Sequence, residues 1–383
     1  MVPKGWSQKL ISDVGAVVTG NTPPTSNPEY YNGKYPFVSP ADLGAHKLIN
    51  SSIKSLSSQG MEKARSVRAG ATLFTCIGST IGKIGLAGCT LATNQQINVV
   101  IPKPDYDDDY VYYQLELRAA YIAKLAGTQA VPIINKTTFE SQCILVPDSL
   151  PEQNKIAKIL STWDKAISTT EQLLANSQQQ KKSLMQQLLT GKKRLLDNNG
   201  VGFSGEWKLG HLSDIAKIGK GKALSSKDLL EGNYPVIAGG KTSPYSHRYF
   251  THENVITVSA SGAYAGYVAY HPYKLWASDC SVVSNKTASN IGFIYQLMTY
   301  MQTKIYSLQS GGAQPHVYPK DLEVLRVSIP PREEQQKIAA VLSTADKEIT
   351  ALQHKLDALK QEKKVLMQQL LTGKRRVKVE EAA

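Results

Sequence analysis

The chain has 383 residues, more than one average domain holds, so its length predicts two or three domains. Hydrophobic residues make up 42% of the chain, enough for ordinary cores, and this share excludes wholesale disorder. Lys and Arg number 44 against 31 Asp and Glu, a formal net charge of +13. Such an excess favours a polyanionic partner, because neutralising phosphates releases their counterions.

The cysteines and the N-terminus exclude several other classes. Cys76, Cys89, Cys143 and Cys280 are scattered without a CxxC pair, which argues against a zinc site or a disulfide framework. The first residues, MVPKGWSQKL, lack the apolar core of a signal peptide, and no apolar run has the length of a membrane span. We therefore expect a soluble, cytoplasmic protein that does not contact a membrane.

Two regions of the chain share one character. Residues 1–150 mix short β-rich segments (PFVSP, ATLFTCI, INVVIP) with a predicted helix at 110–125. Residues 201–330 do likewise, with YPVIAG, NVITVSA, CSVVSN and a helix near 291–308. Gly and Pro interrupt both regions often, so we expect two compact α+β domains with long irregular loops.

A long helix is predicted after each domain, and the two helices are copies of one another. Residues 153–194 align with 335–376 without gaps, and 24 of these 42 positions are identical. A weaker repeat opens each half, where Trp6, Ser12, Asp13 and Gly20 match Trp207, Ser213, Asp214 and Gly221. The expected layout is a domain at 1–150, a central helix at 151–195, a domain at 201–330 and a C-terminal helix at 331–376.

Apolar residues recur along both long helices at alternating steps of four and three, a period that is typical of a coiled coil. The predicted seam consists of Ile156, Leu160, Trp163, Ile167, Leu174, Leu184 and Leu188 in the first helix, and Ile338, Leu342, Ile349, Leu356, Leu366 and Leu370 in the second. Equal helices in a tandem repeat favour a pseudo-twofold axis, which requires an antiparallel pair. The alternative is two ordinary amphipathic helices, each packed on its own domain.

The symmetric antiparallel register pairs Ile156 with Leu370, and it places Trp163 opposite Lys363, where a lysine stem can cover an indole. From Ile156 to Leu188 the helix is roughly 50 Å long at 1.5 Å per residue. A rod of that length can hold two binding domains roughly 34–36 Å apart, which is one turn of DNA.

Loops that carry basic, amide and Tyr side chains suit contacts with phosphates and base edges. The candidates in the first domain are Asn21, Thr22, Ser79, Thr80, Lys83, Gln129, Lys136 and Thr137. Those in the second domain are Lys220, Lys222, Lys241, Ser261, Tyr264, Tyr267, Gln314 and His316. Each alone also fits an ordinary solvated loop residue, but similar patterns recur in both halves, as in GSTIGKIG (78–85) and GAYAGYVA (262–269). We interpret the glycines in these patterns as turn residues. The basic clusters at 192–194 and 374–376 can compensate the helix dipole, contact phosphates or be solvated, and we favour the last of these.

No catalytic set stands out in the sequence. GKT at 240–242 lacks the glycine that a phosphate-binding loop needs five residues earlier. NTPPT at 21–25 differs from the Asn-Pro-Pro-aromatic motif of amino-methyltransferases, and the acidic run at 105–109 fits a solvated loop. We therefore expect no catalytic residues, no metal site and no cofactor in this chain.

Taken together, the repeat and its sequence motifs resemble those of the specificity subunits of type I restriction-modification enzymes. LPEQNKIAKIL, PPREEQQKIAAVL, LLTGKKR and LLTGKRR are similar to the conserved helical regions of that family, and GWSQKLISDVGAVVTGNTP to its domain opening. The resemblance covers essentially the whole chain. It implies two recognition domains that each read half of a split DNA sequence, with an unread spacer between the halves.

The resemblance also implies partners. These are double-stranded DNA, two methyltransferase subunits and restriction subunits, and S-adenosylmethionine, ATP and Mg²⁺ would belong to those subunits. Two alternatives remain open at this point: a self-contained enzyme acting on nucleic acid, which needs a catalytic pocket, and a coiled-coil scaffold whose charge is incidental.

Overall fold

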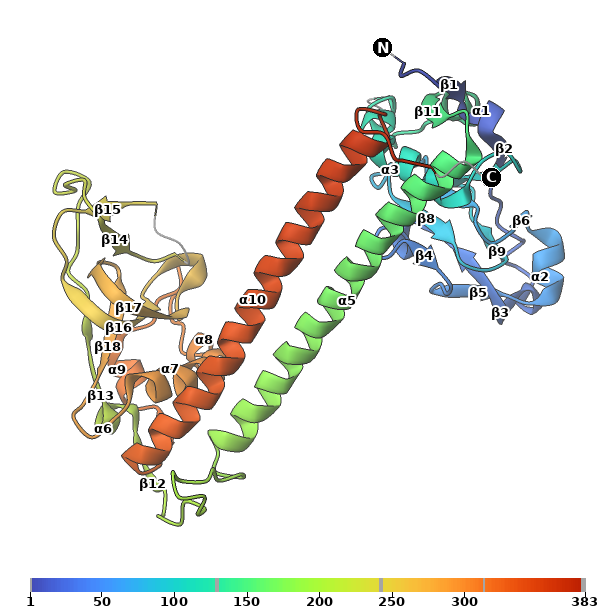
Figure 1. Cartoon of the computed structure of the whole chain (residues 1–383). Coiled ribbons are helices and arrows are strands. Elements are labelled where there is room, and N and C mark those ends of the chain that lie inside the picture. Colours follow the sequence, from blue (N-terminus) through green and yellow to red (C-terminus); the bar gives the residue numbers. More distant parts are fainter. Residues whose placement is uncertain (1, 128–130, 241–243, 313, 380–383) are drawn as a thin grey trace. The chain divides into compact units, whose positions relative to one another are not determined.

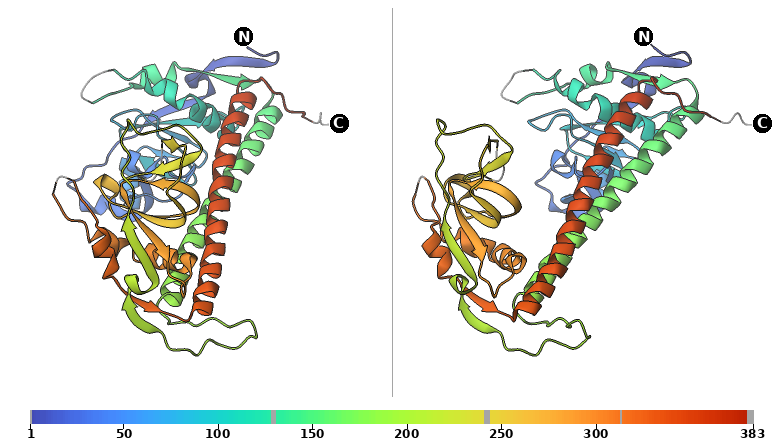
Figure 2. Two further views of the ribbon diagram at one scale, coloured as in Figure 1. Left: turned by 90° about the vertical axis from the view of Figure 1, so that its left-hand side faces the viewer. Right: turned by 60° about the vertical axis from the view of Figure 1, so that its left-hand side comes forward.

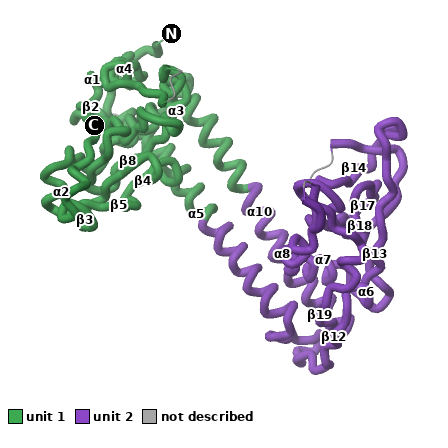
Figure 3. Tube along the Cα trace, turned by 180° about the vertical axis from the view of Figure 1, so that it is seen from behind, with its two compact units in different colours: residues 1–171, 355–383 green, residues 172–354 purple. Residues whose placement is uncertain are grey.

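A computed structural model describes residues 2–127, 131–240, 244–312 and 314–379 (Figure 1). The chain forms two compact units (Figure 3). Unit 1 contains residues 1–171 and 355–383, and unit 2 contains residues 172–354. Each unit therefore combines one sheet-rich domain with a part of both long helices, so the division cuts across the helices.

In unit 1 the central sheet has the strand order β2-β10-β7-β8-β4, a second sheet has the order β5-β3-β9-β6, and β1 pairs with β11. The strands are β1 (Trp6–Leu10), β2 (Gly15–Thr19), β3 (Tyr31–Val38), β4 (Leu48–Ile49), β5 (Lys54–Leu56), β6 (Ser66–Val67), β7 (Thr72–Thr75), β8 (Ile84–Ala87), β9 (Leu91–Thr93), β10 (Ile97–Pro102) and β11 (Cys143–Pro147). The helices of this domain are α1 (Ile11–Val14), α2 (Ser58–Lys63), α3 (Asp108–Ala123) and α4 (Lys136–Glu140). The side chain of Asp107 caps α3 by accepting from the amide of Tyr110, which accounts for part of the acidic run.

In unit 2 one sheet has the order β13-β18-β16-β17-β14-β15, and β12 pairs with β19. The strands are β12 (Lys208–His211), β13 (Ala216–Lys220), β14 (Tyr234–Ile237), β15 (Ser246–His247), β16 (His252–Ser259), β17 (Val268–Ala277), β18 (Cys280–Asn285) and β19 (Arg326–Ile329). The helices are α6 (Leu212–Ile215), α7 (Ile291–Tyr300), α8 (Gln302–Tyr306) and α9 (Pro319–Glu323). Both domains open with a strand that pairs antiparallel with the strand closing the domain, so the repeat extends to topology.

The long helices are α5 (Leu150–Leu188) and α10 (Arg332–Leu370), of 39 residues each. Each follows the closing strand of its domain. Beyond each helix lies a glycine in the left-handed region, Gly191 with φ +71° and Gly373 with φ +66°, a conformation that ends a helix and that side chains with a Cβ rarely adopt. None of the described helices is both long and apolar enough to span a membrane.

The two long helices run antiparallel in both units, side by side in both views of Figure 2. In unit 1, Lys360 pairs with Glu171 at 2.7 Å, and the later Lys363 pairs with the earlier Asp164 at 2.7 Å. In unit 2, the ammonium of Lys181 lies 2.5 Å from Asp346. The seam residues named from the sequence are buried or half-buried, whereas most of their neighbours along the helices are exposed.

Lys363, which the expected register places opposite Trp163, has acidic neighbours. The ammonium of Lys363 contacts the carboxylates of Asp164 and Glu116, at 2.7 and 3.1 Å, and the ring of Tyr113 on α3 at 5.3 Å. The ion pair with Asp164, the residue that follows Trp163, fits the expected register.

An Arg–Glu pair in unit 1 ties the end of α10 to the start of α5. Arg376 donates from Nε and Nη2 to the two carboxylate oxygens of Glu152, at 2.7 and 2.8 Å, and from Nη1 to the carbonyl of Lys4 at 2.7 Å. The side chain of Glu152 is only 5% exposed. The bidentate geometry is the strong form of this contact.

The equivalent pair in unit 2 ties the end of α5 to the start of α10. Arg194 donates to both oxygens of Glu334 at 2.6 and 2.7 Å and to the carbonyl of Gly205 at 2.8 Å, and the indole of Trp207 donates to the same carboxylate at 3.0 Å. The last arginine of each basic cluster thus has a structural role that our interpretation of the clusters as solvated did not include, although Arg376 is also 46% exposed.

Candidate nucleic-acid interface

The turn between β16 and β17 lies against the segment before α9 in unit 2. Ser261 and His316 form a β-bridge, and the amide of Gly262 donates to the carbonyl of Pro315 at 3.1 Å. This pairing brings four predicted residues to one end of the sheet: Ser261, Tyr264, Gln314 and His316. Tyr264 and Gln314 are exposed there.

The end of β13 joins the same place. The amide of Gly221 donates to the carbonyl of Cys280 at 2.8 Å, and that of Lys222 to the carbonyl of Ala277 at 2.8 Å. A Cβ at Gly221 would lie 2.3 Å from the carbonyl oxygen of Ser278, so only glycine permits this approach. The predicted Lys220 and Lys222 therefore flank the turn between β17 and β18, and both are exposed.

A fifth segment, at the end of β14, completes the cluster. The hydroxyl of Ser259 donates to the carbonyl of Gly239 at 2.9 Å, and the amide of Ser278 to that of Ile237 at 2.7 Å. We call the segments 220–222, 237–240, 259–264, 277–280 and 314–316 the loop edge of unit 2. The predicted Lys241 and Gln129 lie outside the described residues.

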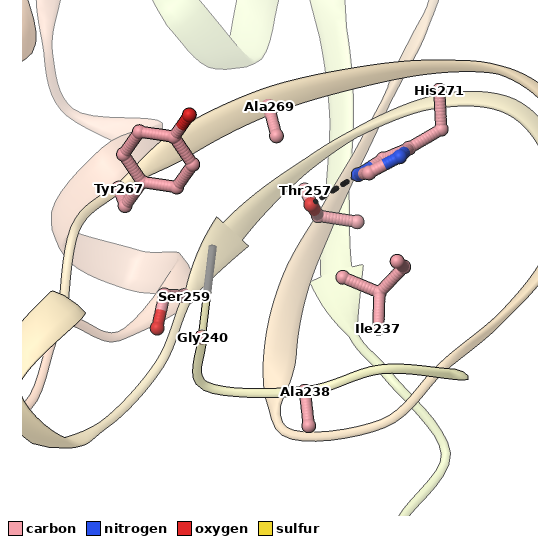
Figure 4. Close-up of a pocket in the computed structure, with 8 residues that line it drawn as sticks. All are labelled: Ile237, Ala238, Gly240, Thr257, Ser259, Tyr267, Ala269 and His271. Carbon is pink, nitrogen blue, oxygen red and sulfur yellow. Dashed lines mark hydrogen bonds between the residues drawn. The ribbon is translucent and has the colours of Figure 1, made fainter. Parts of the chain in front are cut away.

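A small cavity lies beneath the loop edge (Figure 4). It measures about 10 Å³, the space of one water molecule, and the predicted Tyr267 lines it together with Ser259, Thr257 and His271. His271 Nε2 lies 2.9 Å from the hydroxyl of Thr257. Burial lowers the pKa of His271 to about 4, so this imidazole is neutral near pH 7 and offers phosphates no charge.

Unit 1 repeats this arrangement. Ile77 and Ile133 form a β-bridge, and the amide of Gly78 donates to the carbonyl of Pro132 at 2.9 Å. The turn that carries the predicted Ser79 and Thr80 is therefore next to the segment that leads into α4. The predicted Lys136 and Thr137 begin α4 and are exposed.

Two predicted residues have structural roles in unit 1. Asn21 uses both ends of its amide on backbone groups, donating to the carbonyl of Lys63 at 2.9 Å and accepting from the amide of Arg65 at 2.7 Å. The ammonium of Lys83 donates to the carbonyl of Pro40 at 3.3 Å. The exposed Thr22 instead donates to the side chain of Gln95 at 2.7 Å.

The turn glycines behave as expected. Gly78 and Gly82 in unit 1 have φ of +97° and +93°, and Gly262 and Gly266 in unit 2 have +77° and +87°. Turn geometry therefore accounts for all four glycines without a ligand.

Sequence reasoning missed Asp279 and Gln95. The amide of Gly20 donates to the carbonyl of Ile97 at 3.0 Å, as that of Gly221 does to Cys280, so the turns before β10 and β18 correspond. Each turn exposes one side chain that the sequence analysis did not name, Gln95 in unit 1 and Asp279 in unit 2. Extending the repeat alignment to the residues just before INVVIP and CSVVSN is the signal that could have found them.

Among the described residues, no three His, Cys, Asp or Glu side chains are grouped to hold a metal ion. Burial raises the pKa of the Cys76 thiol to about 12, and burial together with Asp279 raises that of Cys280 to about 12. Both thiols are therefore protonated at neutral pH and poor nucleophiles.

The sequence profile of the type I restriction modification DNA specificity domain matches residues 3–179 and 204–361. The chain belongs to this family. Each matched stretch contains one sheet-rich domain and most of the long helix that follows it, which agrees with the duplication.

Similar proteins support the family assignment. The specificity subunit of the type I restriction enzyme MjaIX from Methanocaldococcus jannaschii is 24% identical over 417 residues, covering 98% of this chain and 95% of that protein. That of HindI from Haemophilus influenzae is 30% identical over 174 residues, covering 44% and 38%. The crystal structure of a type I restriction-modification S subunit from M. genitalium matches with a TM-score of 0.70 at 18% identity, covering 97% of this chain and 99% of that one. The fold predicted from the sequence, two α+β domains with long helices in an antiparallel coiled coil, is confirmed.

Proposed function

We propose that this chain reads a bipartite DNA target, with each α+β domain, at 1–150 and 201–330, reading one half and the spacer left unread. The duplicated edge carries this proposal. In both units a turn rich in hydroxyl side chains is bonded to the segment before a short helix, and basic and amide side chains are exposed beside it. Such side chains hold phosphates and read base edges.

In this proposal, partner subunits catalyse the methylation and the cleavage of DNA. The similar proteins are named as specificity subunits of type I restriction enzymes, which favours assembly with methyltransferase and restriction subunits. We infer two methyltransferase subunits because the chain presents two equivalent halves, with the long helices at 151–195 and 331–376 carrying much of the contact. S-adenosylmethionine, ATP and Mg²⁺ would bind those subunits.

Methylome sequencing tests this function. The full chain is expressed with the methyltransferase subunit of its own system in a host without other adenine methylation. We expect one split motif, and we expect that exchange of residues 1–150 for the first domain of another family member changes one half of it only. A change in both halves together would contradict the modular assignment.

The competing scaffold hypothesis gives a different binding result. A scaffold with incidental charge should bind all DNA sequences alike and weakly. A specific reader should prefer its own site by about 4–10 kcal/mol and lose affinity steeply as salt rises. Competition binding of the complete complex on duplexes with and without the methylated motif separates the two.

A further inference from the structure

An exposed carboxylate lies within the loop edge of unit 2. Asp279 follows β17 and is the only acidic residue in the five segments that form this edge. Lys220 and Lys222 flank its turn, and the ammonium of Lys222 lies 5.3 Å from the ring centre of Trp276. A carboxylate in such surroundings needs an explanation if the edge contacts DNA.

The carboxylate is held in place. The hydroxyl of Ser261 donates to Asp279 Oδ2, and the turn backbone is fixed by the bond from the amide of Ser278 to the carbonyl of Ile237. A carboxylate has about four lone-pair positions, so the bond from Ser261 leaves it further capacity to accept hydrogen bonds. Asp279 is thus an oriented acceptor on the exposed side of the edge.

The chemistry of DNA limits what such an acceptor can meet. Phosphates repel it, and guanine offers the major groove acceptors only. Adenine and cytosine each present an exocyclic amino donor there, but in adenine the neighbouring N7 is an acceptor that repels a carboxylate, so cytosine N4 is the donor that Asp and Glu side chains read. We infer that Asp279 reads a cytosine of the second half-site through its N4 amino group, and that Ser261 is the positioning residue for this contact. This inference rests on the proposed function.

The repeat is a further argument for this assignment. In unit 1 the position equivalent to Asp279 is Gln96, because the carbonyl of Gln96 accepts from the amide of Cys76 at 2.8 Å as that of Asp279 accepts from the amide of Ala260 at 3.3 Å. The amide of Gln96 donates to the carbonyl of Ile77, which is the equivalent of Ser261, at 3.4 Å. The same turn therefore carries an amide side chain in unit 1 and a carboxylate in unit 2. Gln is suited to adenine and Asp to cytosine, as two different half-sites require.

The variant Asp279→Asn separates reading from structure. Asn can still accept from Ser261, so a purely structural role survives, but its amide prefers adenine. With the full chain and its methyltransferase subunit, we expect methylome sequencing to report one C·G pair of the second half-site replaced by A·T or no longer selected. The preference for C·G at that position should fall about tenfold. Ser261→Ala should weaken selection at the same pair without a new preference.

Asp228→Asn is the matched control. Asp228 is also exposed and accepts from a serine hydroxyl, that of Ser225 at 2.6 Å, but it lies outside the loop edge. It should leave the motif unchanged, and an intact first half-site reports that each variant folds. An unchanged motif in Asp279→Asn, with unchanged preference, would overturn the inference. A wild-type complex without any split motif would instead defeat the proposed function.

Discussion

Arg194 and Glu334 form a bidentate ion pair in which the glutamate side chain is completely buried and the arginine is 28% exposed. A buried carboxylate is tolerable only while its charge is matched, because removal from water costs several kcal/mol. The end of α5 and the start of α10 are therefore joined by a contact that is costly to break from one side.

We expect Arg194→Met to lower the free energy of unfolding by about 3–5 kcal/mol, because Glu334 stays buried without its cation. The double variant Arg194→Met/Glu334→Leu should recover most of the loss, since no charge then remains buried. Urea denaturation followed by circular dichroism measures both. Lys193→Met, at the exposed neighbour, is the control and should change stability by less than about 0.5 kcal/mol. A loss of similar size in the control would contradict the assignment.

His271 predicts a pH dependence. Burial lowers its folded-state pKa from 6.5 to about 4, so between these values the unfolded chain binds a proton that the folded chain does not. Stability should therefore fall as pH drops from about 6.5 to about 4, by about 3 kcal/mol from this group. His271→Asn should remove that part of the decline, measured as the difference between the pH profiles of the two proteins. Identical profiles would show that the imidazole titrates normally.

The long helices were predictable because their signal is local. The apolar residues recur with a period of 3.5 residues, and 24 of the 42 aligned positions are identical, so both signals can be read from the sequence. Sheet order is not local, since β2 pairs with β10 about eighty residues later, and no period in the sequence specifies that pairing. The role of Arg194 was missed for the same reason, because its partner Glu334 lies 140 residues away.

The candidate site could be proposed from the sequence as a set of loops but not residue by residue. Searching the loops for basic, amide and hydroxyl side chains found Lys222, Ser261 and His316, which the fold then brought together. The same criterion included Asn21, whose side-chain amide is hydrogen-bonded to the backbone. It excluded Asp279, because an acidic side chain argues against a contact with DNA unless its neighbours in the fold are known.

The contact between Arg376 and Lys4 in unit 1 allows a test by circular permutation, in which the chain is joined there and opened elsewhere. Arg376 donates to the carbonyl of Lys4, and the equivalent Arg194 donates to Gly205 across a continuous connection. A linker from residue 379 to residue 3, with new ends opened between the exposed Asn198 and Asn199, should preserve both units. We expect the permuted chain to give the same methylated motif as the natural order. Loss of one half-site would indicate that the continuous connection fixes unit 2.

Helix length predicts the spacer. A heptad adds about 10 Å to a helix, which corresponds to about three base pairs. Both helices must be lengthened together, because an insertion in one alone would let either the Lys181–Asp346 pair or the Lys363–Asp164 pair form, but not both. We expect one heptad added to each helix, after Leu174 and at the facing Leu352, to lengthen the spacer of the methylated motif by about three base pairs while both half-sites stay the same. The control carries the heptad in α5 only and should lose methylation, since the paired charges no longer meet. An unchanged spacer in the doubly lengthened chain would refute the assignment of the coiled coil as the element that sets it.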